Sequence, residues 1–77
     1  MTTMDERTRR MYELVREVRH DLNSPLTSAF GNVQLLLEDP AVTDPETRET
    51  LRDIEADLRR LAGMIRRLSE IQPPEDT

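Results

Sequence analysis

His20, the only histidine of the chain, has the side chain best suited to chemistry, and Asp21 follows it directly. A neutral imidazole on an open surface is a nucleophile. A neighbouring carboxylate can accept the N–H of one ring nitrogen, which makes the other nitrogen more nucleophilic. The reaction that this pair suits is acceptance of a phosphoryl group, from a nucleotide or from another protein.

Three other interpretations of His20 were weighed. A buried core histidine is disfavoured because, at about 100° per helical residue, Val18 and Leu22 each lie about 160° from His20, which places the imidazole on the polar face. An ordinary surface histidine remains open. A Ser-His-Asp hydrolase is disfavoured because Ser24 lies one turn away on an exposed face, where the sequence implies no oxyanion hole.

Pro25 lies inside the predicted first helix, close to the histidine, where a proline is unfavourable. A proline inside a helix lacks the N–H that would bond the carbonyl four residues earlier, here that of Asp21, and it costs ~3 kcal/mol or more. We therefore expect a kink just C-terminal to His20. Because such locally unfavourable residues are typical of functional sites, the proline favours a functional role for the histidine.

Two long amphipathic helices are predicted to carry these residues. Apolar residues recur at steps of three and four on both sides of His20 and again after Pro45, which fits the first turn of a second helix. Pro40 ends the first helix and Pro73 ends the second. The expected organisation is a first helix over about 5–38, a loop over about 39–43, a second helix over about 44–72 and a tail over 73–77, in a single domain spanning 1–77.

The predicted fold is all-α: an antiparallel two-helix hairpin that dimerises into a four-helix bundle. A chain of 77 residues without cysteine buries too little surface for a comfortable core of its own. In the second helix the apolar residues follow a heptad seam. The expected dimer core comprises Val18, Leu22, Leu26, Val33, Leu51, Ile54, Leu58, Leu61, Ile65 and Leu68.

Composition argues against several classes of function. The net charge of −5 disfavours nucleic acid as a partner. A single histidine without cysteine disfavours a metal site. Gly31 and Gly63 are isolated, so no phosphate loop is present and no cofactor is expected on this chain. No apolar run approaches the ~20 residues of a membrane span, so we expect a cytoplasmic segment without membrane contact.

One run resembles the H-box of the dimerisation and histidine-phosphotransfer (HisKA-type phosphoacceptor) domain of bacterial sensor histidine kinases: HDLNSPLTSAFGNVQLL, from His20 to Leu36. The family pattern is His, an acid, an apolar residue, often a basic residue, then Thr or Asn, then Pro-Leu. A glycine and a leucine pair follow. The second helix also fits, so the resemblance covers nearly the whole chain.

The resemblance implies roles for the catalytic candidates. His20 would accept the phosphoryl group, Asp21 would assist its transfer, and Pro25 would provide the kink. Ser24 stands where members with phosphatase activity usually carry Thr or Asn, so that activity is in doubt. Asn23 replaces the commoner basic residue and loses a positive charge near the incoming phosphate.

The resemblance also implies partners. Thr27, Ser28 and Gly31, with the facing part of the second helix, would receive the receiver domain of a response regulator; close helix packing is an equal alternative for Gly31. ATP with Mg²⁺ is expected on a separate catalytic domain, acting in cis or in trans. The sequence leaves open whether this chain is a part of a larger kinase or a free-standing phosphotransfer protein.

Two non-catalytic alternatives remain. The chain could be a helical dimer that binds and sequesters or inhibits a kinase or receiver domain, or a generic coiled-coil adaptor. Four arginines of the second helix bear on this question, because they form either a solvated face paired with acids of the first helix or a contact surface for an acidic partner. They are Arg59, Arg60, Arg66 and Arg67.

Overall fold

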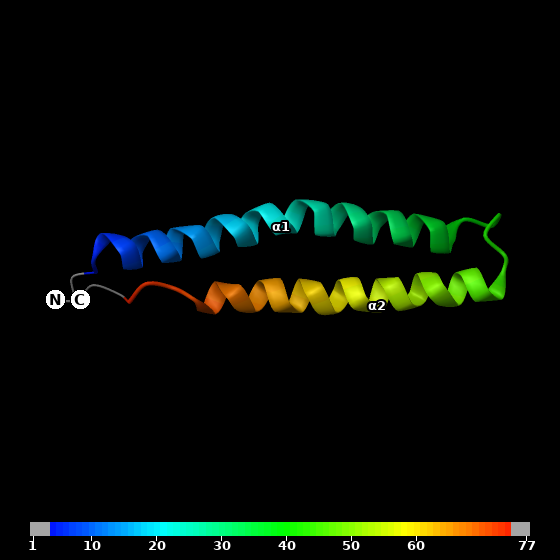
Figure 1. The fold of residues 1–77 in the computed structure, drawn as a ribbon. Coiled ribbons are helices and arrows are strands. Elements are labelled where there is room, and N and C mark those ends of the chain that lie inside the picture. The colour runs from blue at the N-terminus through cyan, green and yellow to red at the C-terminus, as the bar shows by residue number, and fades with distance from the viewer. Residues whose placement is uncertain (1–3, 75–77) are drawn as a thin grey trace.

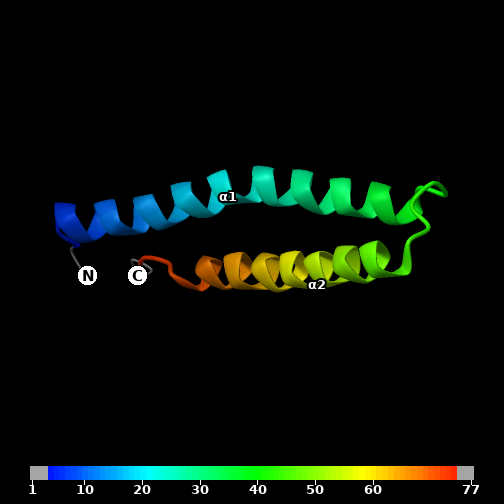
Figure 2. The same cartoon turned by 45° about the vertical axis from the view of Figure 1, so that its right-hand side comes forward.

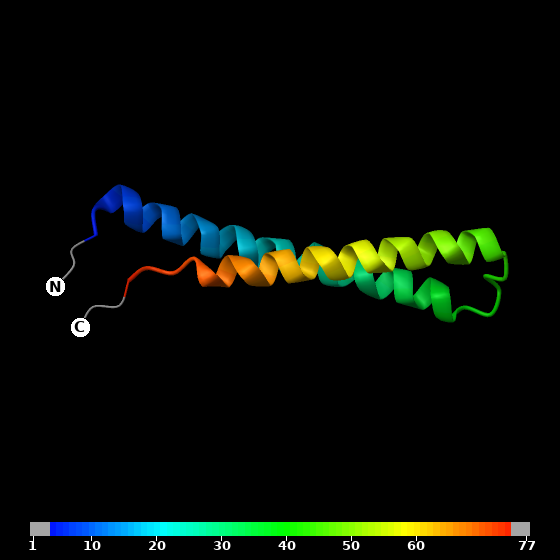
Figure 3. The same cartoon turned by 90° about the horizontal axis from the view of Figure 1, so that it is seen from below.

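The computed structural model describes residues 4–74, which form an antiparallel helical hairpin (Figure 1). Helix α1 spans Glu6–Glu38, helix α2 spans Pro45–Arg67, and the 3₁₀ turn η1 spans Leu68–Glu70. The helices lie side by side and cross at a shallow angle (Figure 3), as helices do when their side-chain ridges interdigitate. The all-α hairpin predicted from the sequence is therefore confirmed. Within the described residues, neither helix has the length and apolar character needed to cross a membrane.

Both helices begin at an aspartate whose side chain caps the first turn. Asp5 Oδ1 accepts a hydrogen bond from the Thr8 N–H at 2.8 Å. Asp44 Oδ2 accepts from the N–H and the hydroxyl of Thr47, at 2.9 and 2.7 Å. These bonds lower the pKa of each carboxyl below its ordinary value, chiefly through the Thr8 backbone for Asp5 and the Thr47 side chain for Asp44. Each cap satisfies a backbone N–H that the helix leaves without a partner.

Arg48 ties the start of α2 to the end of α1 across the loop seen in Figure 2. Its Nη1 donates to the Val42 carbonyl and its Nη2 to the Leu37 carbonyl, both at 3.0 Å. The last four carbonyls of a helix have no partner inside it, and the Leu37 carbonyl is one of them. The first helix has no basic residue in its own last turn, so the second helix supplies the donor.

The second helix ends earlier than the predicted boundary near residue 72. The α-helix stops at Arg67, and η1 follows it. Pro73 cannot donate to the Ser69 carbonyl, which would be its partner in an α-helix. The Gln72 Nε2 donates to that carbonyl instead, at 2.8 Å. The proline thus removes the helical partner of the Ser69 carbonyl, and the Gln72 side chain takes its place.

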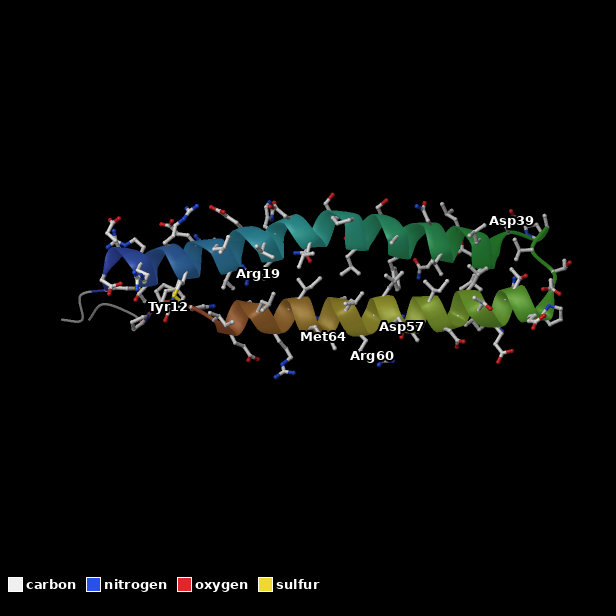
Figure 4. All side chains as sticks on the ribbon, viewed as in Figure 1. Tyr12, Arg19, Asp39, Asp57, Arg60 and Met64 are labelled. Atoms are coloured by element: carbon white, nitrogen blue, oxygen red, sulfur yellow. The ribbon has the colours of Figure 1, made fainter. Side chains whose placement is uncertain are left out.

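The hairpin by itself buries few apolar side chains: Val33, Leu51 and Ile65. Three members of the predicted dimer core, Leu26, Leu58 and Leu68, are half-buried. Figure 4 shows Met64 on the side of α2 that faces away from α1. Large apolar side chains remain exposed at Met11, Leu14, Val18, Leu22, Leu35, Leu36, Ile54, Leu61, Met64 and Ile71. Most of the apolar stripe is thus left without a partner inside one hairpin.

Candidate functional site

His20 is exposed on α1 and lies at the edge of an open hollow of about 700 Å³. The residues that line this hollow are His20, Asp21, Asn23, Ser24, Thr27 and Ser28. All six were singled out in the sequence, and the helix brings them onto one continuous surface because their spacing over about two and a half turns keeps them on one side. Pro25 and Gly31 do not line the hollow.

The carboxylate of Asp21 does not meet the His20 ring. Among the hydrogen bonds of residues 4–74, none joins these two side chains. Consecutive residues of a helix diverge by about 100°, so their side chains do not face each other. Asp21 would therefore reach the imidazole only after a rotamer change or through a water molecule.

Pro25 lies inside α1, and the helix continues through it. The helix bows in its cyan part, with its convex side away from α2 (Figure 2). The missing N–H of Pro25 leaves the Asp21 carbonyl without its helical partner. The Asp21 carbonyl therefore lacks its helical hydrogen bond in an exposed residue directly after His20.

A second hollow, of about 560 Å³, meets His20 from the other side and lies between the two helices. We call it the arginine hollow; its lining residues are Arg16, Glu17, Arg19, His20, Asn23, Ile65, Arg66 and Ser69. Figure 4 shows Arg19 on the side of α1 that faces α2. Neither Arg16 nor Arg19 was predicted from the sequence as a site residue. Arg16 stands four residues, about one turn, before His20, and this spacing is the signal that places Arg16 and His20 on one helix face.

Arg59 and Arg60 of α2 do not pair with acids of the first helix, which was one of the two alternatives for these arginines. Arg59 pairs with Glu55 at 3.9 Å and Arg60 with Asp57 at 3.2 Å, and both pairs lie within α2. No ion pair joins α1 to α2 in residues 4–74. An apolar seam separates the charged faces of the helices, so partners one turn apart on the same helix are closer.

Arg59 also contacts the first helix through an aromatic ring. Its guanidinium carbon lies 5.5 Å from the centroid of the Phe30 ring, a cation–π geometry. A third hollow, of about 370 Å³, lies beside this contact. Its lining residues are Leu26, Thr27, Phe30, Leu58, Arg59, Ala62 and Arg66. Two arginines line this hollow, as does the predicted docking residue Thr27.

Gly31, the last predicted docking residue, is half-buried yet not closely packed. A Cβ added there would meet no atom within 4 Å outside its own stretch of helix. Close packing of α2 against Gly31 is therefore not the reason for this glycine within one hairpin. The surface around it is free to receive another molecule.

No metal centre is apparent in the described part of the chain, since no three His, Asp or Glu side chains there are grouped to hold an ion. The two hollows beside His20 are lined by three guanidinium groups, two carboxylates, the apolar Ile65 and neutral polar side chains. This set of donors suits an anion better than a cation.

Comparison with known proteins gives one match. A family model described as the His Kinase A (phospho-acceptor) domain matches residues 5–76. The matched range contains both helices and every residue of the two hollows beside His20. Searches of curated proteins and of solved structures found no match.

Proposed function

The chain belongs to the family of His Kinase A phospho-acceptor domains, and from that premise we propose that His20 takes up a phosphoryl group and passes it to an aspartate of a response regulator. The family assigns the chain a phosphoacceptor and dimerisation role in two-component signalling. The observation that carries the proposal is the position of the single histidine, exposed at the meeting point of two open hollows.

The transfer balances as two displacements at phosphorus. In the first, one imidazole nitrogen forms an N–P bond while the P–O bond to the donor's leaving group breaks. The proton on the other ring nitrogen passes to Asp21, directly or through water. In the second, an aspartate oxygen of the receiver domain forms an O–P bond, the N–P bond breaks, and the departing imidazole regains a proton.

The proposed donor is ATP with Mg²⁺ on a separate kinase domain, in cis or in trans, and the proposed acceptor is a receiver domain. Thr27 and Ser28 line the same hollow as His20, and the Phe30–Arg59 contact lies beside it. A receiver domain docked over this surface would bring its aspartate to the imidazole. We place this exchange in the cytoplasm, where ATP is available.

We propose a homodimer in which two hairpins cover each other's apolar stripes. Val18, Leu22 and Leu61 are each more than two-fifths exposed in one hairpin. His20 lies about 160° around α1 from Val18 and Leu22. Packing along the stripe therefore leaves the phosphoacceptor surface open on both sides of a four-helix bundle.

Ser24 bears on whether the chain also removes phosphate from the regulator. Its side chain lines the hollow beside His20. A hydroxyl can orient a water molecule, though an amide would present both a donor and an acceptor. We expect Ser24→Asn to raise the rate of phospho-aspartate hydrolysis in the receiver and Ser24→Ala to lower it, both measured as phosphate release.

The test of the phosphoacceptor role is incubation with a kinase ATP-binding domain or a phosphorylated receiver, followed by intact-mass and peptide mass spectrometry. The wild type should gain one phosphoryl group on His20, and His20→Ala should gain none. Equal labelling of both proteins would contradict the proposal.

The competing function is a helical dimer that binds and sequesters or inhibits a kinase or receiver domain without accepting phosphate. The apolar hollow beside Phe30 supports binding independently of the imidazole. Unchanged receiver affinity together with unchanged pathway output in His20→Ala would favour this function. Loss of output at unchanged affinity would favour phosphotransfer.

A further inference from the structure

We propose that Arg66 of α2, together with Arg16 and Arg19 of α1, forms an anion site beside His20 that holds the oxygens of a phosphoryl group. The proposal rests on the phosphoacceptor role of His20 and extends it to specific residues from both helices. It predicts that a tetrahedral dianion binds in the arginine hollow even when no phosphoryl group is transferred.

The geometry comes from the packing of the two helices. The arginine hollow is lined by residues of α1, of α2 and of η1, with the buried side chain of Ile65 among them. Ser69 also lines it, but its hydroxyl already donates to the Arg66 carbonyl at 2.6 Å. That bond leaves the guanidinium of Arg66 as the principal donor from this side of the hollow.

The charge in the hollow is opposite to that of the chain. Three arginines and one glutamate line it, in a chain whose net charge is −5. None of the three arginines pairs with a carboxylate among residues 4–74, whereas Arg10, Arg59 and Arg60 each do. Guanidinium groups bind phosphate oxygens in a bidentate manner, and no ion pair within residues 4–74 holds these three guanidinium groups to a carboxylate.

The arginine hollow stays accessible in the proposed dimer. Arg66 lies about 160° around α2 from the exposed Met64, and Arg16 lies about 160° around α1 from Val18. By these angles Arg16 and Arg66 lie away from the exposed apolar stripe, whereas Arg19 faces α2 and lies about 60° around α1 from Leu22. A second hairpin packed on the stripe would leave the hollow open at Arg16 and Arg66.

The positive charge that Asn23 does not provide comes from Arg66 in this arrangement. Asn23 lacks the positive charge that commonly stands at its position, yet it lines the arginine hollow together with Arg66. The charge beside the imidazole is thus supplied from the second helix. A phosphoryl group on His20 would gain contacts from both helices, and the separation between α1 and α2 would then affect how firmly it is held.

The experiment titrates sodium sulfate into the chain and follows the ring Hε1 proton by NMR, which is assigned without ambiguity because His20 is the only histidine. Sodium chloride at matched ionic strength measures the non-specific effect of salt. The variants are Arg66→Gln, Arg66→Lys and Arg67→Gln. Arg67 is the matched control, because it is the next residue of α2, is equally charged and exposed, and does not line the hollow.

We expect a saturable sulfate-dependent shift in the wild type and in Arg67→Gln. Arg66→Gln should bind about fivefold more weakly, the effect of one exposed charge contact. Arg66→Lys should fall between them, because it keeps the charge but loses the bidentate geometry. Circular dichroism and sedimentation verify that each variant keeps its helicity and mass.

Two outcomes would overturn the anion site: a shift no larger than that with sodium chloride, or equal weakening in Arg66→Gln and Arg67→Gln. These outcomes are separate from failure of the phosphoacceptor role. Sulfate binding that depends on Arg66 in a chain that never becomes phosphorylated would refute phosphotransfer alone. Phosphorylation of His20 without sulfate binding would refute the anion site alone.

Discussion

Leu61→Ala tests whether the exposed apolar stripe is a dimer interface. Leu61 is 47% exposed in one hairpin. Full burial of a leucine side chain stabilises by about 1.5–3 kcal/mol, so roughly half of that remains to be gained from a partner. The substitution occurs in both subunits of a homodimer. It should therefore weaken association by ~1.5–3 kcal/mol, or about 10- to 150-fold in Kd.

Leu35→Ala is the matched control, because it removes the same atoms from an even more exposed position. Leu35 is 66% exposed. It lies about 140° around α1 from Leu22, away from the stripe. If exposure alone governed association, the control would weaken the dimer as much as Leu61→Ala. Packing along the stripe predicts that the control leaves Kd unchanged within about twofold.

The assay is sedimentation equilibrium over a range of protein concentrations, with helicity followed by circular dichroism. The wild type should sediment at twice the 9.0 kDa mass of one chain. Leu58→Glu and Leu61→Glu should dissociate or unfold the dimer, since each places an unpaired charge in the seam. A fully helical wild type with the mass of one chain would refute the reasoning, as would equal weakening by Leu35→Ala.

Three further predictions concern the helices and their joint. Gly31→Ala should stabilise the fold by ~1 kcal/mol in thermal unfolding, as should the comparison variant Gly63→Ala, because neither site is crowded. Only Gly31→Ala should weaken receiver binding if a receiver docks there, so unchanged affinity would contradict that docking position. Arg48→Gln removes two hydrogen bonds to backbone carbonyls and should cost ~1–3 kcal/mol in urea unfolding, whereas Arg52→Gln on the exposed face should cost less than ~0.5. The lowered pKa of Asp44 means that its ionised cap stabilises the fold at pH values above the ordinary carboxyl pKa, and that this contribution is lost as the pH falls through the pKa of the folded state. Asp44→Ser should therefore show a smaller decrease in Tm on acidification than the wild type. An identical decrease in both proteins would refute the titration argument.

The sequence alone determined the helices and the polar face that carries His20. Local patterns are sufficient for this purpose: steps of three and four define the helices, prolines limit them, and the angle per residue places the imidazole opposite Val18 and Leu22. The residues of the first hollow also follow from local spacing, because they all lie within about two and a half turns of one helix. The end of α2 was predicted less well: a 3₁₀ turn follows Arg67, and the Gln72 side chain makes the hydrogen bond to the Ser69 carbonyl that Pro73 cannot make.

The tertiary structure decided everything that joins the two helices. Arg66 reaches the surroundings of His20, Arg59 covers the Phe30 ring, and Arg48 binds the last turn of α1. Each contact depends on the register between the helices, which the loop and the packed apolar seam set together. A helical repeat specifies which face a side chain occupies, but it does not specify which residue of the other helix lies opposite.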